Sequence, residues 1–205
     1  MTTIVDYGMG NLGSVKNMLK KIGEGAVVSS DARAINEATK IILPGVGAFD
    51  NAMINLQQLD LIAAIKQKVL EDKTPILGIC LGMQLLTNGS EEGKCEGFGF
   101  IEGSAKRFNF QDHDKKLPVP HMGWNRVHVK KESPLFEGMP DDPRFYFVHS
   151  YAVECANRND ILTTTEYGYE FVSCFEHENI LGCQFHPEKS HKFGMQLFKN
   201  FVEYY

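Results

Sequence analysis

The stretch of sequence that most constrains the fold runs from Thr74 to Leu86. Its first half is a short apolar run after a proline, which is typical of a buried strand, and its second half has helical spacing. Between the two halves lies the turn 78–82, in which a glycine stands two residues to each side of Cys80. Small neighbours of this kind permit a sharp strand-to-helix turn that pushes the central side chain outward, as in a nucleophile elbow.

Cys80 has two interpretations at this point. A sulfur at a helix N-terminus feels the positive end of the helix dipole, which favours the thiolate and can bring a cysteine pKa to roughly 3.5–7.5. The alternative is a buried structural cysteine, because free cysteines are usually buried and unreactive. The turn alone does not decide between a catalytic and a structural thiol.

The first half of the chain alternates strands with helices. Strands are expected at 2–6, at 26–29 and at 40–43, the last closed by Pro44, and helical spacing covers 12–22 and 61–69. Strands that are separated by helices indicate a parallel sheet covered on both faces. The expected fold is therefore α/β, with a mainly parallel central sheet and helices on both faces.

The second half of the chain has a different pattern, in which turns join short apolar segments. Six segments read as strands: 104–110, 126–130, 144–149, 161–166, 170–176 and 180–185. We expect the sheet to gain antiparallel strands there, followed by an amphipathic helix at the C-terminus. The polar run 111–116 is expected to form an exposed loop. With 205 residues and no clear linker, residues 1–205 are expected to form a single domain.

Composition narrows the classes of function. The net charge of -5 gives no support for nucleic-acid binding, which usually needs a basic balance. No run reaches the ~18 apolar residues of a membrane span, and the first residues lack a charged leader with an apolar core. The 5 cysteines have no paired C-x-x-C spacing, which argues against a structural zinc site and for a reducing compartment. A cytoplasmic protein without a metal or membrane partner is expected.

A glycine-rich turn near the N-terminus offers one alternative. Residues 8–13 fit G-x-G-x-x-G, follow an expected strand and open an expected helix, and Asp31 lies at a plausible distance. This arrangement would suit a dinucleotide. The pattern alone is weak because any tight strand-to-helix turn favours glycine.

The segment around His186 decides between the interpretations of Cys80. In an extended segment, residues two apart point the same way, so His186 and Glu188 share a face. Pro187 between them stiffens this geometry. A histidine beside a carboxylate that holds its tautomer is the base and orienter of a catalytic triad, for which Cys80 supplies the nucleophile. A solvated surface pair is the alternative.

A third segment is expected to supply backbone N–H donors for the oxyanion of a tetrahedral intermediate. The strand 40–43 runs into Pro44-Gly45-Val46-Gly47, where the glycines allow the peptide at Val46 or Gly47 to turn an N–H toward an oxyanion. The backbone N–H of Leu81, directly after the nucleophile, would be the second donor.

These segments resemble the class I, or triad-type, glutamine amidotransferases, and the resemblance covers essentially the whole chain. The motifs that carry it are Gly78-Ile79-Cys80-Leu81-Gly82-Met83-Gln84, Pro44-Gly45-Val46-Gly47 and Phe185-His186-Pro187-Glu188-Lys189-Ser190. Within that family, three stretches are similar to the glutaminase subunits of imidazole glycerol phosphate synthases. They are Asp6-Tyr7-Gly8-Met9-Gly10-Asn11-Leu12, Pro120-His121-Met122-Gly123-Trp124-Asn125 and Tyr146-Phe147-Val148-His149-Ser150-Tyr151.

The resemblance implies an amidotransferase fold, L-glutamine as substrate, no cofactor, and catalysis by Cys80, His186 and Glu188. It also implies a heterodimer with a (β/α)8-barrel cyclase that consumes the released ammonia in histidine biosynthesis. The residues it implies for the glutamine head group are Gly45, Gln84, His149, Ser150 and Tyr151. The residues it implies for the cyclase interface are Gly10, Asn11, Met122, Trp124 and Lys189.

Two departures from the family pattern keep other acceptors open. Gly13 stands where many relatives carry an arginine, and the stretch 111–118, before the motif that begins at Pro120, is longer than the family pattern. Neither departure involves the triad. Both favour the alternative of a paralogue that supplies ammonia for another reaction, such as sugar amidination. A γ-glutamyl or other cysteine hydrolase with the same triad, and a non-enzymatic dinucleotide-binding module, are the remaining alternatives.

Overall fold

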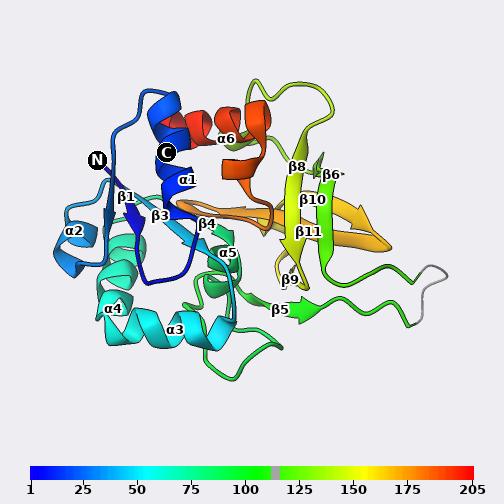
Figure 1. Cartoon of the computed structure of the whole chain (residues 1–205), viewed down its shortest axis with the longest axis horizontal. Coiled ribbons are helices and arrows are strands. Elements are labelled where there is room, and N and C mark those ends of the chain that lie inside the picture. Colours follow the sequence, from blue (N-terminus) through cyan, green and yellow to red (C-terminus); the bar gives the residue numbers. More distant parts are fainter. Residues whose placement is uncertain (112–115) are drawn as a thin grey trace.

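The computed structural model describes residues 1–111 and 116–205, and a mixed sheet of 10 strands organises this part of the chain (Figure 1). Five neighbouring strands of this sheet are parallel. In spatial order they are β2 (Ala26–Ser29), β1 (Thr2–Val5), β3 (Lys40–Gly45), β4 (Ile76–Cys80) and β12 (Ile180–Cys183). The expected parallel core of the fold is confirmed.

Helices cover both faces of the parallel strands (Figure 1). Helices α1 (Leu12–Lys21) and α6 (His191–Tyr204) pack on one face. The other face carries α2 (Ala32–Asn36), α3 (Phe49–Gln58), α4 (Leu61–Lys66) and α5 (Leu81–Leu85). None of the helices in the described residues is both long enough and apolar enough to cross a membrane.

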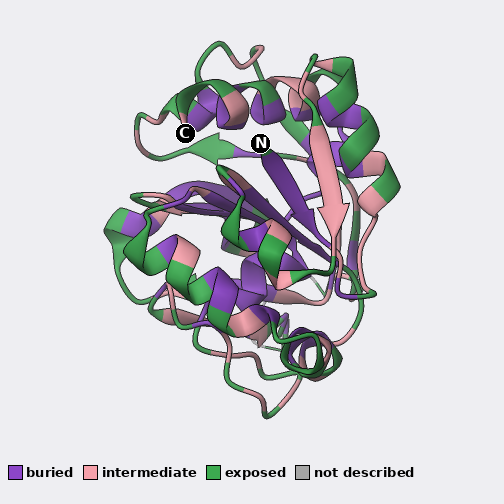
Figure 2. Ribbon diagram, turned by 90° about the vertical axis from the view of Figure 1, so that its left-hand side faces the viewer, coloured by how far each residue is buried: buried purple, intermediate pink, exposed green. Residues whose placement is uncertain are grey.

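Each parallel strand sends alternate side chains to the two faces, as the period of a strand requires. In β4, Ile76 joins the apolar cluster under α3 and α4, whereas Leu77 and Ile79 join the cluster under α1 and α6. Four of these strands, β1, β3, β4 and β12, are buried on both faces, whereas the edge strand β2 is half-buried; Figure 2 shows the buried sheet between helices with exposed outer sides. The near-continuous apolar runs in the sequence follow from this two-sided burial.

The second half of the chain extends the sheet with antiparallel strands, also as expected. They are β11 (Tyr169–His177), β10 (Ile161–Tyr167), β7 (His128–Val129), β9 (Tyr151–Cys155) and β5 (Gly103–Arg107). A separate antiparallel pair is formed by β6 (His121–Arg126) and β8 (Arg144–His149). Short helical turns lie at Gln67–Glu71, Pro134–Phe136, Arg158–Asp160 and Pro187–Lys189.

Several elements differ from the sequence-based expectation. Strands β6 and β9 and helix α3 were not expected, and β12 is parallel to β4 rather than antiparallel. Strand β3 does not stop before Pro44 but continues to Gly45, because β4 pairs with it over that length. In the run expected as a loop, Gln111 and Lys116 are exposed, whereas residues 112–115 lie outside the described part of the chain.

Helix α5 lies unusually close to the sheet. A Cβ atom on Gly82 would stand 1.8 Å from the carbonyl oxygen of Leu43, and one on Gly78 would stand 2.7 Å from the backbone of Gly82. Only hydrogen fits at these two positions. The glycines that flank Cys80 therefore let the turn between β4 and α5 fold back against β3.

Two glycine-to-alanine variants test this packing. Gly13→Ala, where a Cβ would meet nothing within 4 Å, should raise the free energy of unfolding by about 0.4–1 kcal/mol, because it restricts the unfolded chain. Gly82→Ala should lower it by about 1–3 kcal/mol, because the methyl group overpacks against Leu43. Urea unfolding of the three chains measures both changes, and equal stability of Gly82→Ala and the wild type would contradict the packing argument.

Candidate active site

Cys80 occupies a strained turn at the end of β4. Its backbone has φ 55° and ψ -108°, a region that residues with side chains rarely adopt and that costs of order 1–3 kcal/mol. The residue is 7% exposed and its sulfur faces a pocket. The sharp strand-to-helix turn expected from the sequence is therefore present, with the thiol at its apex.

His186 and Glu188 lie beside this turn because their segment follows β12, the parallel neighbour of β4. The carboxyl ends of parallel strands meet at one edge of a sheet, so Cys80 and His186 reach the same pocket. The Nδ1 atom of His186 lies 2.8 Å from Oε1 of Glu188, and both side chains are almost fully buried. Since a carboxylate only accepts, Nδ1 carries the proton, and Nε2 is left for chemistry.

The backbone around His186 is also fixed. Its N–H donates to the carbonyl of Tyr146 at 2.8 Å, and the Ser190 hydroxyl donates to its carbonyl at 2.6 Å. Burial lowers the pKa of His186, but the nearby Cys80 sulfur and the Glu188 carboxylate favour the imidazolium more strongly and raise the pKa to about 10. Within the described residues, the Nε2 atom of His186 is buried and has no hydrogen-bond partner. Cys80 and His186 thus reach the same pocket, with the ring of His186 held by Glu188 and favoured in its charged form.

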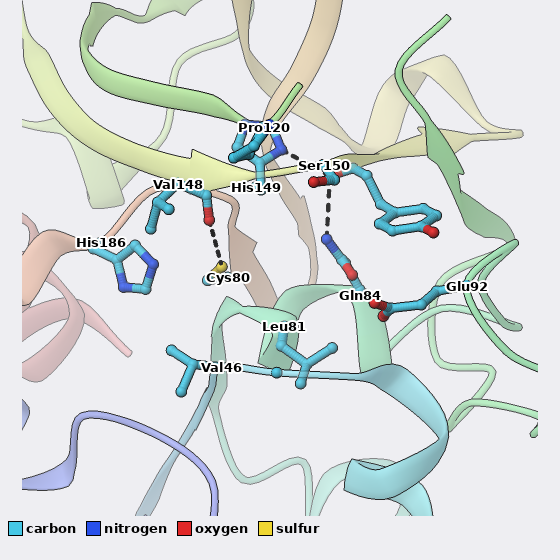
Figure 3. A pocket seen from close by; sticks show the side chains of 12 residues that line it. Val46, Cys80, Leu81, Gln84, Glu92, Pro120, Val148, His149, Ser150 and His186 are labelled. Carbon is cyan, nitrogen blue, oxygen red and sulfur yellow. Dashed lines mark hydrogen bonds between the residues drawn. The ribbon is translucent and has the colours of Figure 1, made fainter. Parts of the chain in front are cut away.

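The pocket at this edge has a volume of about 330 Å³, within the usual range for small ligands (Figure 3). Nine of the residues singled out by sequence line it: Val46, Gly47, Cys80, Leu81, Gln84, His149, Ser150, Tyr151 and His186. Glu188 stands behind His186 rather than in the lining. Glu92, Pro120 and Val148 complete the wall and were not expected from the sequence.

The end of β3 forms the wall opposite Val148. Val46 and Leu81 lie together beneath Cys80 in Figure 3, and Gly47 has a φ of 107°, which favours glycine. Gly45 lies just behind, where a Cβ atom would stand 2.4 Å from the hydroxyl oxygen of Tyr7. That hydroxyl donates to the carbonyl of Pro44 at 2.7 Å. The backbone at Val46 is therefore anchored from below while it faces the pocket.

Glu92 reaches the pocket on a loop that α3 holds in place. Its Oε2 atom accepts a hydrogen bond from the N–H of Phe49 at 2.9 Å. In the same loop, the N–H groups of Cys95 and Lys94 bind the carboxylate of Asp50, and these bonds hold the pKa of Asp50 below its usual value. The sequence offered no periodic or motif signal for Glu92, because its position depends on this contact between a loop and a distant helix.

His149 takes part in a directed chain of hydrogen bonds behind the pocket. The carbonyl of Tyr151 can only accept, so Nδ1 of His149 donates to it at 2.7 Å, which leaves Nε2 of His149 as an acceptor. Nδ1 of His121 then donates to that atom at 3.1 Å, and the amide of Asn125 donates to the other nitrogen of His121 at 3.2 Å. Both histidines are neutral in this chain. Burial agrees with this, lowering the pKa of His149 to about 3 and of His121 to about 4.

The residues expected at a partner interface are not among those that line the pocket. Met122 is 63% exposed and Trp124 47% exposed, both on β6, and Met122 pairs with the pocket residue Val148 across β6 and β8. Lys189 is exposed, with its ammonium group 5.7 Å above the ring of Tyr146. Gly10 and Asn11, both partly exposed, precede α1.

The glycine turn 8–13 has structural uses that replace the dinucleotide interpretation. A Cβ on Gly10 would contact Pro44 at 3.4 Å, so this turn packs against the end of β3. Asp31 is the N-cap of α2, where its carboxylate accepts from the N–H of Arg33 at 2.8 Å.

Within residues 1–111 and 116–205, no group of three His, Cys, Asp or Glu side chains is placed to hold a metal ion.

The neutral histidine chain makes a testable prediction about acid stability. Because burial lowers the pKa of His121 from 6.5 to about 4, the unfolded chain binds more protons between these values, so stability falls as pH drops through that window. Urea unfolding at pH 7 and pH 5 should show a smaller decrease for His121→Asn than for the wild type. The exposed His128, changed to Asn, should keep the wild-type decrease. An equal decrease in all three chains would contradict the prediction.

Comparison with known proteins agrees with this geometry. The family model described as "Glutamine amidotransferase class-I" matches residues 3–204. The imidazole glycerol phosphate synthase subunit HisH 2 of Methanococcus maripaludis is 53% identical over 99% of both chains. The subunit HisH of Sulfurimonas denitrificans is 50% identical over 100% of this chain and 98% of that protein.

Solved structures share the fold at much lower identity. A crystal structure of a glutamine amidotransferase superposes with a TM-score of 0.73 at 18% identity, covering 98% of this chain and 97% of the other. The structure of PurLQS from Thermotoga maritima gives a TM-score of 0.73 at 18% identity, covering 99% and 97%. With a strained cysteine elbow, a buried histidine–glutamate pair and a whole-length match to the family model, this chain belongs to the class I glutamine amidotransferases.

Proposed function

We propose that this chain is a glutaminase subunit that hydrolyses L-glutamine to glutamate and ammonia. The observation that carries the proposal is the meeting of Cys80, at the apex of a strained turn, with the buried His186–Glu188 pair at one pocket. Whole-length similarity to subunits of imidazole glycerol phosphate synthases supports the same activity. Residues 1–205 are proposed to form one amidotransferase domain, because both apolar clusters pack on the same sheet.

The proposed mechanism follows from the chemistry of the three side chains. The Cys80 thiolate attacks the side-chain amide carbon of glutamine, and the oxyanion binds to backbone N–H groups of Leu81 and of Val46 or Gly47. His186 then gives its Nε2 proton to the leaving nitrogen, and ammonia departs. The same nitrogen next takes a proton from water, which hydrolyses the glutamyl thioester, while Glu188 holds the ring and stabilises its charge.

The proposed site for the glutamine head group lies at the other end of the pocket. Both hydrogens of the Gln84 amide are used, one by the carbonyl of Tyr151 and one by Gln184, so its oxygen is left to accept from an α-ammonium group. The carboxylate of Glu92 lies beside Gln84 in Figure 3 and adds a negative charge. The backbone of Ser150, together with Gly45 behind the site, completes this part of the proposal.

The proposed partner is a (β/α)8-barrel cyclase that uses the ammonia to make imidazole glycerol phosphate in histidine biosynthesis. The relatives named above are subunits of imidazole glycerol phosphate synthases, which supports a synthase complex. The exposed apolar side chains of Met122 and Trp124, on the strand β6 that pairs with β8, are the proposed centre of the interface, together with Gly10, Asn11 and Lys189. An interface beside the pocket would shorten the path of the ammonia.

A second candidate is the same glutaminase serving another acceptor, such as a sugar that is amidinated. Two relatives are named HisH 2, one from Methanococcus maripaludis and one from Pseudomonas aeruginosa at 48% identity. The number 2 in these names is compatible with a second subunit of this kind that serves a different acceptor. Copurification with candidate barrel subunits, followed by an ammonia-transfer assay with the substrate of each, separates the two acceptors.

Replacement of the nucleophile tests the proposed reaction. Cys80→Ala should abolish glutamine-dependent synthesis in the reconstituted complex, because no thioester can form. Synthesis from added ammonium salts should stay near the wild-type rate, since the acceptor chemistry takes place in the partner. Glutamine-driven turnover by Cys80→Ala at the wild-type rate would overturn the assignment.

Replacement of Trp124 tests the proposed interface. Trp124→Ala should weaken binding of the cyclase by about 10-fold or more, because buried aromatic side chains dominate interface affinity. Leu70→Ala is a matched control, since Leu70 is 48% exposed on the π-helical turn after α4, and it should leave the affinity unchanged. Titration calorimetry measures both. Equal affinities of the two variants would exclude Trp124 from the interface.

A further inference from the structure

Gln184 is a buried side chain that the proposed mechanism does not use. It lies between the end of β12 and His186, is 0% exposed, and its backbone N–H donates to the carbonyl of Ser173 at 2.9 Å. Its side-chain nitrogen Nε2 stands 3.6 Å from the sulfur of Cys80. A buried amide this close to a reactive sulfur has to present either a donor or an acceptor to it.

A chain of hydrogen bonds decides which atom faces the sulfur. The carbonyl of Tyr151 can only accept, so the group of Gln84 that lies 3.2 Å from it is the NH₂ group. The second hydrogen of that NH₂ points to Gln184, at 3.1 Å, where only an oxygen can accept it. The amide oxygen of Gln184 therefore faces Gln84, and its NH₂ group faces Cys80.

We propose that Gln184 is a hydrogen-bond donor to the Cys80 sulfur, which it holds in place and favours as a thiolate. The proposal rests on the proposed function, in which that sulfur attacks glutamine. A donor stabilises the charged form of an acceptor more than the neutral form, and hydrogen bonds to charged groups are the stronger ones. The fixed amide of Gln184 supplies such a donor without having to reorganise.

Two other features around the sulfur favour the neutral thiol, and the donor acts against them. The carbonyl of Val148, 3.9 Å away, accepts from the thiol S–H and so favours the neutral form (Figure 3). Burial around Cys80, which is 7% exposed, also disfavours a charge. His186 favours the thiolate from one side by its charge, and Gln184 does so from another through a directed N–H.

The titratable groups around the sulfur decide what an alkylation profile reports. Burial raises the pKa of Tyr7 and of Cys183, so both stay neutral from pH 5 to 9. The Cys80 sulfur and the Glu188 carboxylate raise the pKa of His186 to about 10, so His186 and Cys80 titrate as a coupled pair. Glu92 lines the far part of the pocket and is the same in every variant below. A difference between the profiles of two variants therefore reports how each variant changes the ionisation of this pair, in which the sulfur is the alkylated group.

The test is the pH profile of Cys80 alkylation by iodoacetamide in the full chain, followed by mass spectrometry of the peptide that contains Cys80. Gln184→Met keeps the length of the side chain and removes the donor. Its profile should shift upward by about one pH unit, which is an about 10-fold slower alkylation at pH values below the midpoint. Above the midpoint its rate should equal or exceed that of the wild type, because a thiolate of higher pKa is the stronger nucleophile.

Asn200→Leu is the matched control. Asn200 is a buried amide in α6 that donates to the carbonyls of Leu135 and Glu137, away from the pocket. Its replacement should lower the melting temperature and leave the alkylation profile unchanged. If Gln184→Met only lost stability, its melting temperature would fall and its alkylation profile would stay unchanged, as in the control. Loss of the donor instead moves the midpoint of the alkylation profile to higher pH.

A further variant keeps the test decisive if Gln184→Met does not fold. Gln184→Asn retains a buried amide but draws the NH₂ group back from the sulfur, so it should shift the profile in the same direction by a smaller amount. A midpoint equal to that of the wild type in the folded variant overturns the proposal. Glutaminase activity is assayed in parallel on the wild-type complex, so an inactive complex would count against the proposed function and not against the role of Gln184.

Discussion

The close approach of α5 to the sheet is the constraint on which the candidate site depends. A hydrogen at Gly82, where a Cβ would collide with the carbonyl oxygen of Leu43, lets the helix begin directly above β3. The chain must therefore turn sharply at Cys80, which takes a backbone conformation that costs of order 1–3 kcal/mol. The surrounding packing holds this strain. The thiol consequently stands at a fixed point at the edge of the parallel strands, in one pocket with His186, which follows β12, and Val46, which follows β3.

The antiparallel half of the molecule contributes the opposite wall and ties it to the nucleophile. The carbonyl of Tyr151 accepts from both His149 and Gln84, and Gln84 in turn orients Gln184 toward the sulfur. His149 is itself held by His121 on β6, the strand that exposes Met122 and Trp124. Buried polar chains of this kind are stable only when every member is satisfied, so the two halves of the site share one geometry.

Part of the site could be predicted from sequence because local rules determine it. The glycines around Cys80 specify a sharp turn, and the spacing of His186, Pro187 and Glu188 places the ring beside the carboxylate. The parallel order of β1, β3 and β4 follows from helices between apolar runs. Helix α3 was missed although its buried residues Phe49, Ala52, Met53 and Leu56 have helical spacing, whereas strands β6 and β9 show no clear alternation of apolar residues. The two strands depend on partners far along the chain, β8 for β6 and β5 for β9.

The sequence by itself determined the α/β class, the nucleophile turn and the histidine–glutamate pair, since each rests on residues that are near neighbours in the chain. The tertiary structure alone decided that β12 runs parallel to β4, which brings His186 to Cys80 across more than 100 residues. It also decided the positions of Glu92 and Gln184 and the tautomers of His121 and His149. These depend on hydrogen bonds between segments remote in sequence, whose geometry no periodicity or motif encodes.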